Sequence, residues 1–322
     1  MNFSDYYILY PNAKLNLNLF IGEKEKTWWT DQQGNPLFYH RLLSVMVPIN
    51  LYDRMIIKPG RFKVEYVFKK SSLDNSFANS SIDYFNNDLQ KSISDNCIIK
   101  KVIEKFNLNE DKIDYEITIE KNIPLASGLG GGSSNAAFFI KFLMEKGIIK
   151  FKSQKELLRK TCEIGSDVPF FFINSPSIVS GFGEKITLIK NFNNLIFVIF
   201  QPFKKISTQL MYSELDNISN RKIINKKFEK KMIKKFKKNL QNTKNYVSSL
   251  SEIANNDFEL IVSKKYDEFD KWKLLFKGSL FAQISGAGSS IFGVFSKYQD
   301  AKNCYENLKN IHGRVYICSC KI

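Results

Sequence analysis

The stretch Pro124-Leu-Ala-Ser-Gly-Leu-Gly-Gly-Gly-Ser-Ser-Asn-Ala-Ala137 decides how the rest of this chain is interpreted. It follows an alternating pattern typical of a strand, at residues 113–119, and precedes an apolar run, at residues 136–144, that favours a helix. Glycines lack a Cβ atom, so this backbone can approach a ligand closely. Ser133 and Ser134 stand where the helix is expected to start, and the unpaired N–H groups of a helix start attract anions. The stretch therefore predicts a phosphate-binding loop.

Other known phosphate loops do not fit this stretch. A P-loop ends in Gly-Lys-Ser/Thr, and no Lys directly follows these glycines. The dinucleotide fingerprint requires a glycine where Ser133 stands. Protein kinases need a His-Arg-Asp sequence, which neither His40 nor His312 begins. A flexible Gly/Ser linker is the remaining alternative, and the adjoining strand and helix patterns weigh against it.

The composition indicates a globular protein with room for two domains. The chain has 322 residues, enough for two hydrophobic cores, and its 43% hydrophobic content is ordinary. No apolar run reaches the length of a membrane span, and the first residues predict no signal peptide. The five cysteines lack metal-type spacing, so we expect reduced thiols and a cytoplasmic protein.

The net charge of +16 has two interpretations. It could attract nucleic acid or anionic nucleotides, or it could reflect a bias toward lysine in solvated positions. The lysines are spread over nearly the whole length, which favours the second interpretation. We therefore expect neither a nucleic-acid partner nor membrane association.

Residues 221–238 predict a basic amphipathic helix, since Phe228, Met232, Phe236 and Leu240 recur at every fourth position. Such a helix could face nucleic acid or an acidic membrane. A surface helix whose apolar stripe packs on the second domain is the favoured interpretation.

A leucine row near the N-terminus predicts a half-buried strand. Leucines 15, 17 and 19 alternate with Asn16 and Asn18, so Lys14 and Asn16 share the opposite face. An ordinary edge strand is the structural alternative. The polar residues 22–38, which include Trp28-Trp29, predict a loop.

The segment Gly165-Ser-Asp-Val-Pro-Phe170 offers a candidate catalytic carboxylate. It follows residues 153–162, which predict a helix with a capping box, and Pro169 is expected to prevent further helix. An Asp at a helix exit often only forms a turn. Asp167, however, precedes three phenylalanines, and a carboxylate beside apolar surface needs a partner or a function.

Three stretches resemble the signatures of the GHMP kinases, a family of small-molecule kinases. Residues 11–17 resemble the first signature, Pro-x-Ala-Lys-x-Asn-Leu, and residues 124–134 the second, Pro-x-x-x-Gly-Leu-Gly-x-Ser-Ser. Residues 284–292 resemble the third, a second glycine loop that we expect between a strand and a helix. Weaker landmarks include Gly165–Phe170, so the resemblance extends over most of the chain.

The longer form Gly-Leu-Gly-Gly-Gly-Ser-Ser-Asn-Ala-Ala is typical of one branch of the family, which acts on a cytidine diphosphate-linked methylerythritol. Tyr39-His40-Arg41-Leu42 is similar to that branch's Gly-Tyr-His-Glu-Leu. Here Phe38 replaces the Gly and Arg41 replaces the Glu.

The resemblance implies an α+β fold of two domains. Residues 1–185 would form an N-terminal α/β ATP-binding domain, and residues 186–322 a C-terminal, ferredoxin-like domain on the substrate side. The implied activity is phosphorylation of the 2-hydroxyl of the cytidyl substrate in non-mevalonate isoprenoid biosynthesis. ATP and Mg²⁺ would be required, and the protein would be a monomer or weak homodimer.

The resemblance also assigns roles to residues. Asp167 would accept or orient the proton of the acceptor hydroxyl, and Lys14 would stabilise charge and keep Asp167 ionised. The residues implied in ATP binding are Pro124, Leu125, Ala126, Ser127, Gly128, Leu129, Gly130, Gly131, Gly132, Ser133, Ser134, Asn96 and Lys121. Those implied in substrate binding are Asn16, Tyr39, His40, Thr208, Tyr212, Gly286, Gly288 and Ser289. Ser134 and Glu156 are candidate magnesium ligands. Tyr39 and Tyr212 would stack on either side of the cytosine while His40 reads its polar edge.

Three alternatives stay open. A sister kinase for homoserine or a mevalonate derivative would share the glycine loops but lack the cytidine-binding residues. A nucleic-acid binder would use the basic helix. A catalytically dead relative is disfavoured because Lys14 and Asp167 are both present.

Overall fold

The computed structural model describes residues 6–31, 33–68, 97–190, 192, 195–202, 207–218, 225–241, 246–311 and 313–321. These residues form two compact units. The first combines residues up to 13 with 51–125 and 130–172, and the second combines 14–50, 126–129 and 173 onward. Each unit is thus assembled from separate pieces of chain. A domain boundary between residues 185 and 186 stays a prediction.

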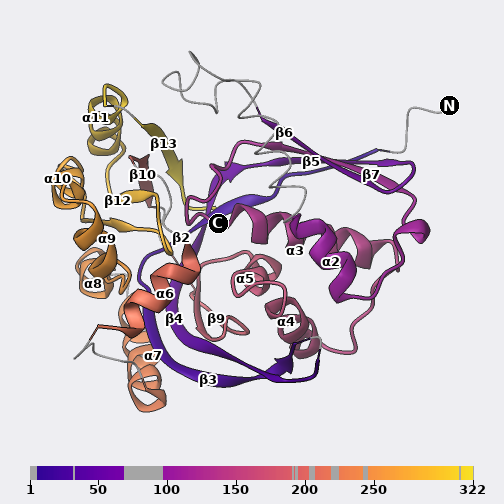
Figure 1. Ribbon diagram of the computed structural model, residues 1–322. Coiled ribbons are helices and arrows are strands. Elements are labelled where there is room, and N and C mark those ends of the chain that lie inside the picture. The colour runs from indigo at the N-terminus through magenta and orange to yellow at the C-terminus, as the bar shows by residue number, and fades with distance from the viewer. Residues whose placement is uncertain are drawn as a thin grey trace. The chain divides into compact units, whose positions relative to one another are not determined.

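The first unit contains a four-stranded sheet in the order β1-β5-β7-β6 (Figure 1). Its strands are β1 (Tyr7–Leu9), β5 (Arg54–Pro59), β6 (Lys63–Phe68) and β7 (Tyr115–Lys121). Only β6 and β7 pair in parallel; the other neighbours are antiparallel. The alternating pattern at 113–119 thus belongs to β7, which begins two residues later than predicted.

Helices cover one face of this sheet, and Figure 1 shows α2 and α3 against it. The helices of the first unit are α2 (Ile98–Lys105), the 3₁₀ turn η2 (Glu110–Lys112), α3 (Gly131–Glu145), α4 (Gln154–Cys162) and α5 (Val168–Ile173). The ring of Phe142 on α3 meets Tyr115 edge-on, with the ring centroids 5.0 Å apart. This packing of helix on sheet gives the unit its core.

Two predictions about helix ends have different outcomes. The capping box is confirmed, because Ser153 Oγ accepts a hydrogen bond from Glu156 N at 3.2 Å at the start of α4. The expectation that Pro169 prevents further helix is wrong, since Pro169 lies in the first turn of α5. A proline is tolerated there because the first N–H groups of a helix have no intrahelical partner.

The second unit contains a five-stranded sheet. Its strands are β2 (Asn12–Asn16), β3 (Phe20–Thr30), β4 (Pro36–Tyr52), β8 (Ser177–Gly181) and β9 (Lys185–Leu188). They pair in the order β2-β4-β8-β9, and β3 pairs with β4. The chain passes from the first unit into the second within β2.

The loop predicted at residues 22–38 is wrong, because β3 and β4 form a long hairpin through most of it. Trp28 and Trp29 explain why the strand persists: each ring centroid lies 5.5 Å from that of Phe182, beside β8. The polar composition of β3 does not indicate a strand, because the aromatic contacts that stabilise it involve Phe182, which is distant in sequence.

A second sheet in this unit has the order β11-β12-β10-β13. Its antiparallel strands are β10 (Ile196–Gln201), β11 (Phe281–Ile284), β12 (Ile291–Phe295) and β13 (Arg314–Ser319). The first strand in sequence lies between the third and the fourth, with helices before β11 and between β12 and β13. This is the expected ferredoxin-like arrangement, so that prediction is confirmed.

The third-signature loop joins two strands, β11 and β12, rather than a strand and a helix, so that expectation is wrong. Residues 291–295 are all buried and pair with β10 and β11. A short apolar run of this kind fits a core strand as well as a helix start, and sheet pairing decides between them.

Six helices among the described residues belong to the second unit. They are α6 (Thr208–Asp216), α7 (Lys226–Gln241), α8 (Tyr246–Ile253), α9 (Glu259–Lys265), α10 (Phe269–Leu274) and α11 (Tyr298–Lys309). The basic helix predicted over 221–238 corresponds to α7, and residues 221–224 lie outside the described part of the chain. Its apolar stripe is used in packing: Phe236 and Leu240 are fully buried.

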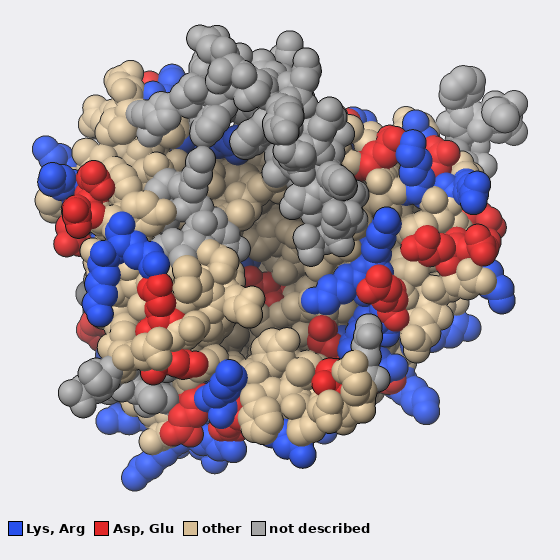
Figure 2. All heavy atoms as spheres, in the orientation of Figure 1, with Lys and Arg blue, Asp and Glu red and all other residues tan. Residues whose placement is uncertain are grey.

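The distribution of charged side chains and the state of the cysteines can be compared with the expectations from composition. On the face shown in Figure 2, the described Lys and Arg residues lie among Asp and Glu rather than in one continuous basic field. No helix in the described ranges is both long and apolar enough to cross a membrane. All five cysteines are buried and none forms a disulfide, and burial raises the pKa of Cys318 and Cys320 to about 12.

Candidate active site

The glycine loop places a helix start where the sequence predicts an anion site. Gly128 and Gly130 adopt φ of 78° and 73°, the left-handed region that glycine enters without strain. Helix α3 begins at Gly131, so Ser133 and Ser134 lie within its first turn. Gly130 is the N-cap and has no side chain to bond to the free N–H groups. These donors and the positive end of the helix dipole suit a phosphate.

In the first unit, a buried lysine lies beside this helix start. The ammonium of Lys121 pairs with the carboxylate of Asp53, and both side chains are buried. A Cβ atom on Gly131 would lie 3.3 Å from Lys121 Nζ, so the ammonium is adjacent to the first turn of α3. Asp53 is held in turn by the backbone N–H groups of Asn122 and Ile123, each at 2.9 Å. The pair as a whole is neutral, and its ammonium end lies next to the first turn of α3.

The Asp167 segment also reaches the start of α3 within the first unit. A Cβ atom on Gly165 would lie 3.6 Å from Ser133 Oγ. The turn from Gly165 is closed by a hydrogen bond from Val168 N to Gly165 O at 3.0 Å, and α5 begins at Val168. Asp167 is half-buried within this turn. A carboxylate and the helix start that is predicted to bind phosphate thus belong to one compact unit.

The two candidate magnesium ligands differ in their surroundings. Ser134 Oγ is fully buried and has no hydrogen-bond partner among the described residues. Mg²⁺ takes oxygen ligands and keeps several waters, so a single hydroxyl at a phosphate site fits it. Glu156 Oε2 instead accepts a hydrogen bond from Lys152 N at 2.7 Å, in keeping with its role in the cap of α4. The described residues contain no group of three His, Cys, Asp or Glu that could hold a metal.

In the second unit, Lys14 is tied to the glycine loop. Its side chain is 1% exposed, and its ammonium donates to Gly128 O at 3.0 Å and to the side-chain oxygen of Asn16. The backbone repeats the connection, since Lys14 N donates to Leu129 O at 2.9 Å. A buried ammonium needs such partners, and they fix its position next to the loop.

The two glycine loops meet closely in the same unit. A Cβ atom on Gly128 would lie 1.9 Å from Ser285 O, so no other residue fits there without rearrangement. Ser285 Oγ donates to Gly128 O at 3.0 Å, and Ser290 N donates to Ser127 O at 3.1 Å. A Cβ on Gly286 would lie 3.6 Å from the side-chain oxygen of Asn16. The structure therefore brings together predicted residues from all three signatures.

The residues predicted to recognise the nucleobase lie on β4 and α6 of the second unit. His40 stacks on Tyr212, with centroids 5.0 Å apart and an interplanar angle of 15°. His40 Nδ1 lies 3.0 Å from Gly22 O, and Nε2 lies 3.2 Å from a carboxylate oxygen of Asp216. Both ring nitrogens thus lie within hydrogen-bond distance of an oxygen atom.

Tyr39 lies on the other face of β4 from His40, because neighbouring strand residues alternate. It is 50% exposed, and its ring centroid lies 5.4 Å from that of Trp29. Stacking of a cytosine between Tyr39 and Tyr212 stays a prediction. Thr208 is the first residue of α6, the helix that also carries Tyr212.

The remaining predicted residues are Asn96, Gly288 and Ser289, and Gly288 O would lie 3.0 Å from a Cβ atom on Gly128. Asn96 lies outside the described residues. Ser289 is fully buried and accepts a hydrogen bond from Gln201 Nε2 at 2.8 Å, on the second sheet. Gly288 has a φ of 78°, which requires glycine. Ligand contacts of these three residues stay predictions.

Sequence reasoning missed Asp53 and Asp216. Asp53 meets Lys121 only because β5 and β7 pair, with Arg54 opposite Glu120. No local pattern marks that pairing. Asp216 stands four residues after Tyr212 on α6, and this spacing places two side chains on one face of a helix. That signal could have indicated Asp216 as a neighbour of the recognition residues.

These components are the ones that phosphoryl transfer requires. The first unit holds the start of α3, the Lys121–Asp53 pair and a half-buried carboxylate. The second unit holds Lys14, whose ammonium is bonded to Gly128 O. Phosphoryl transfer depends on positioning and charge stabilisation more than on covalent chemistry.

Comparisons with known proteins point in the same direction. The model described as GHMP kinases N terminal domain matches residues 96–175, and that described as GHMP kinases C terminal matches residues 232–314. A 4-diphosphocytidyl-2-C-methyl-D-erythritol kinase of Clostridium kluyveri is 31% identical over 314 residues, covering 95% of this chain and 96% of that protein.

Two solved structures resemble the fold. A 4-(cytidine 5'-diphospho)-2C-methyl-D-erythritol kinase is similar at a TM-score of 0.61, with 20% identity over 97% of this chain and 98% of its own. The mevalonate kinase of Methanococcus jannaschii reaches a TM-score of 0.62, with 16% identity over 99% of this chain and 100% of its own. At these identities the likeness concerns the fold alone.

Proposed function

Since this chain belongs to the GHMP kinase family, we propose that it transfers the terminal phosphoryl group of ATP to the 2-hydroxyl of 4-diphosphocytidyl-2-C-methyl-D-erythritol. It is a small-molecule kinase, and this acceptor would place it in non-mevalonate isoprenoid biosynthesis. The observation that carries the proposal is 31% identity to a kinase of that name over nearly the whole chain. The described site supports it through the connection of Lys14 to the glycine loop.

In the proposed mechanism, the phosphates of ATP bind to the N–H groups at the start of α3. The Lys121 ammonium, whose charge Asp53 balances, lies beside Gly131 and would donate a hydrogen bond at that point. Bound Mg²⁺ would neutralise phosphate charge, and the buried Ser134 hydroxyl would be its protein ligand.

Asp167 would accept or orient the proton of the acceptor hydroxyl, and Lys14 would stabilise the charge that develops on the transferred group. Lys14 suits this role because Gly128 O and Asn16 hold its ammonium in one place. A preorganised charge stabilises a transition state without further rearrangement. Asn16, Thr208, Gly286, Gly288 and Ser289 would line the acceptor.

For the cytidyl part of the acceptor, His40 and Tyr212 form the recognition pair. Aromatic stacking on a base contributes about 1–3 kcal/mol, but it hardly distinguishes cytosine from uracil. The polar edge of His40, beside Asp216, would supply that distinction.

A kinase for homoserine or a mevalonate derivative is the second candidate. The fold does not discriminate, because a mevalonate kinase and a cytidyl-substrate kinase have nearly equal TM-scores, 0.62 and 0.61. Sequence relatives and the His40–Tyr212 pair favour the cytidyl substrate. A nucleic-acid binder is disfavoured, because Lys and Arg are interspersed with acids on the face in Figure 2. We further propose a cytoplasmic enzyme that is a monomer or weak homodimer.

The deciding experiment incubates the pure protein with ATP, Mg²⁺ and separate acceptor alcohols. Phosphorus NMR and mass spectrometry identify the product, and coupled ADP release gives kcat/KM for each acceptor. We expect the cytidyl substrate to be preferred strongly over homoserine and mevalonate derivatives. Equal efficiency with all of them would overturn the substrate assignment and leave only the family.

A further inference from the structure

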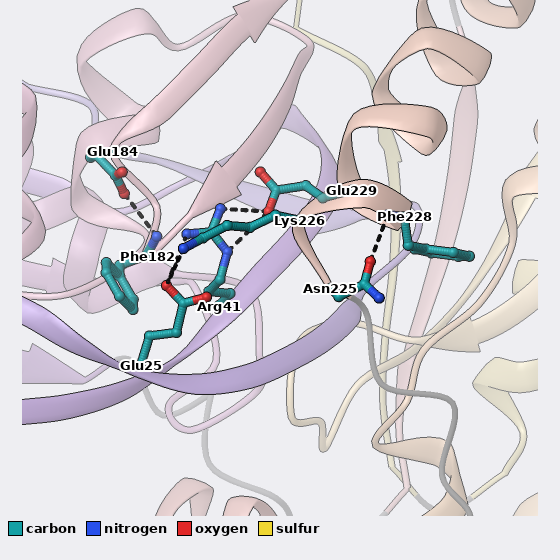
Figure 3. A network of polar contacts seen from close by, with 8 residues as sticks. All are labelled: Glu25, Arg41, Phe182, Glu184, Asn225, Lys226, Phe228 and Glu229. Carbon is teal, nitrogen blue, oxygen red and sulfur yellow. Dashed lines mark hydrogen bonds and ion pairs between the residues drawn. The ribbon is translucent and has the colours of Figure 1, made fainter.

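In the second unit, a buried ion pair joins helix α7 to β4, the strand that carries Tyr39 and His40 (Figure 3). Arg41 donates from Nε at 3.1 Å and from Nη2 at 2.5 Å to one carboxylate oxygen of Glu229, and each residue is only 6% exposed. Arg41 Nη1 also lies 3.6 Å from Glu25 on β3, whose carboxylate meets Lys226 at 3.3 Å. Arg41 stands where the family's Gly-Tyr-His-Glu-Leu has its acid, so this chain carries the opposite charge there.

Burial of this pair needs a reason beyond stability. Removing two charges from water costs free energy that their attraction only partly offsets, so buried pairs are weak stabilisers. Their better-attested use is to select one packing arrangement over others. The planar guanidinium of Arg41 is suited to this, because its fixed donors define an orientation as well as a contact.

The backbone beside Arg41 is irregular. In the β3–β4 ladder, Ile21 pairs with Leu42 and Lys24 pairs with His40, so Gly22 and Glu23 together oppose Arg41. Two residues opposite one is a β-bulge, which interrupts the ladder and redirects side chains. Ladder hydrogen bonds alone therefore do not fix this part of β4.

The bulge lies next to His40, the residue proposed to read the cytosine. His40 precedes Arg41, and its Nδ1 contacts the carbonyl of Gly22, which is itself part of the bulge. His40 is bound to α6 through Tyr212 and Asp216, whereas Arg41 is bound to α7 through Glu229. The irregular strand is thus held by two helices.

We propose that Arg41 and Glu229 are positioning residues for substrate recognition. Their ion pair fixes the bulged strand so that His40 presents its ring against Tyr212. Helix α7 takes part in recognition through its buried acid, and the exposed Lys230 and Lys234 do not. The inference rests on the proposed function in one respect, since it names the cytidyl part of the acceptor as what His40 reads.

Four variants of the full chain test this proposal: Arg41→Lys, Arg41→Met, Glu229→Gln and the charge exchange Arg41→Glu with Glu229→Arg. Arg41→Lys keeps the positive charge but loses the planar guanidinium, which donates two hydrogen bonds to Glu229. The measurements are kcat, KM for the cytidyl acceptor and KM for ATP, with circular dichroism to verify folding. We expect Glu229→Gln and Arg41→Lys to raise the acceptor KM on the order of tenfold, while KM for ATP changes less than about twofold. The charge exchange should recover part of the loss.

Two matched controls separate positioning from general damage. Glu120→Gln breaks the partly exposed Arg54–Glu120 pair of the first unit, 2.9 Å long, and should leave both KM values unchanged. Lys230→Gln with Lys234→Gln changes exposed positions of α7 and should do the same. Equal increases in both KM values, or none, in folded Glu229→Gln would overturn the proposal.

Two further outcomes are informative. If Arg41→Met and the exchanged pair fail to fold, Arg41→Lys and Glu229→Gln, which change the packing volume little, still decide the question. If the wild-type protein does not use the cytidyl substrate, the proposed function fails. The same KM ratio, measured with the acceptor it does use, then tests the ion pair separately, and an unchanged ratio would overturn it.

Discussion

The glycine loop and the Tyr39–Arg41 segment perform their proposed tasks by different means. The loop offers backbone N–H groups, and its shape depends on local features such as the positive φ of Gly128 and Gly130. The Tyr39–Arg41 segment offers side chains on a bulged strand, held by residues as distant as Glu229, 188 positions along the chain. A site made of backbone can therefore be recognised from a short motif, whereas one made of side chains depends on the whole fold.

The largest effect should come from removing the chemistry while leaving both regions intact. Asp167→Asn should cut kcat on the order of a hundredfold or more, because the amide cannot accept the hydroxyl proton. ATP and acceptor binding, followed by calorimetry, should stay nearly normal. Turnover close to that of wild type would remove Asp167 from the mechanism.

Breaking the loop's backbone should give the next largest effect. Gly128→Ala introduces a Cβ atom 1.9 Å from Ser285 O at a φ of 78°, so we expect a loss of about 2–4 kcal/mol in unfolding free energy. Gly132→Ala is the matched control, because nothing lies within 4 Å of its Cβ position. Alanine there should gain about 0.4–1 kcal/mol.

Urea denaturation measures both glycine variants. The two glycines stand in one motif, so a difference between the unfolding free energies of the two variants reports the local surroundings of each Cβ position. Similar stabilities for Gly128→Ala and Gly132→Ala would contradict the close approach of the two glycine loops.

Changes in the recognition region should act on one substrate only. His40→Ala and Tyr212→Ala should each raise the acceptor KM by an amount equivalent to about 1–3 kcal/mol, while KM for ATP changes little. Tyr212→Phe keeps the ring and should be mild. Steady-state kinetics with each substrate varied in turn measures this, and parallel increases in both KM values would argue against a role in base recognition.

The smallest effect is expected on the outer face of α7. Replacing Lys230, Lys231, Lys234 and Lys235 by Gln should alter solubility and salt sensitivity but leave kcat within about threefold. All four positions are exposed. Loss of activity in a variant that stays folded would show that this face contributes to function, and would blur the distinction from buried Glu229.

Local sequence patterns predict several elements of the fold. The capping box at Ser153, the strand around Ile117 and the stripe of α7 follow from side-chain periodicity and short-range hydrogen bonds, which a sequence displays directly. The half-buried strand predicted from the leucine row is wrong, because β2 ends at Asn16 and is buried on both faces. Local patterns failed where packing overrode them. The hairpin through Trp28-Trp29 and the strand after the second glycine loop depend on Phe182 and on β10, partners that no local window contains.

The sequence by itself determined the glycine loops, the Lys14 motif, the Asp167 turn and the family, because each is a short motif whose residue types indicate their chemistry. Only the tertiary structure decided that Lys14 bonds to Gly128, that Asp53 neutralises Lys121 and that Arg41 meets Glu229. These contacts join residues 68 to 188 positions apart. The partners of a buried charge depend on which groups lie close to it and on how far it is removed from water, and both are set only by the folded chain.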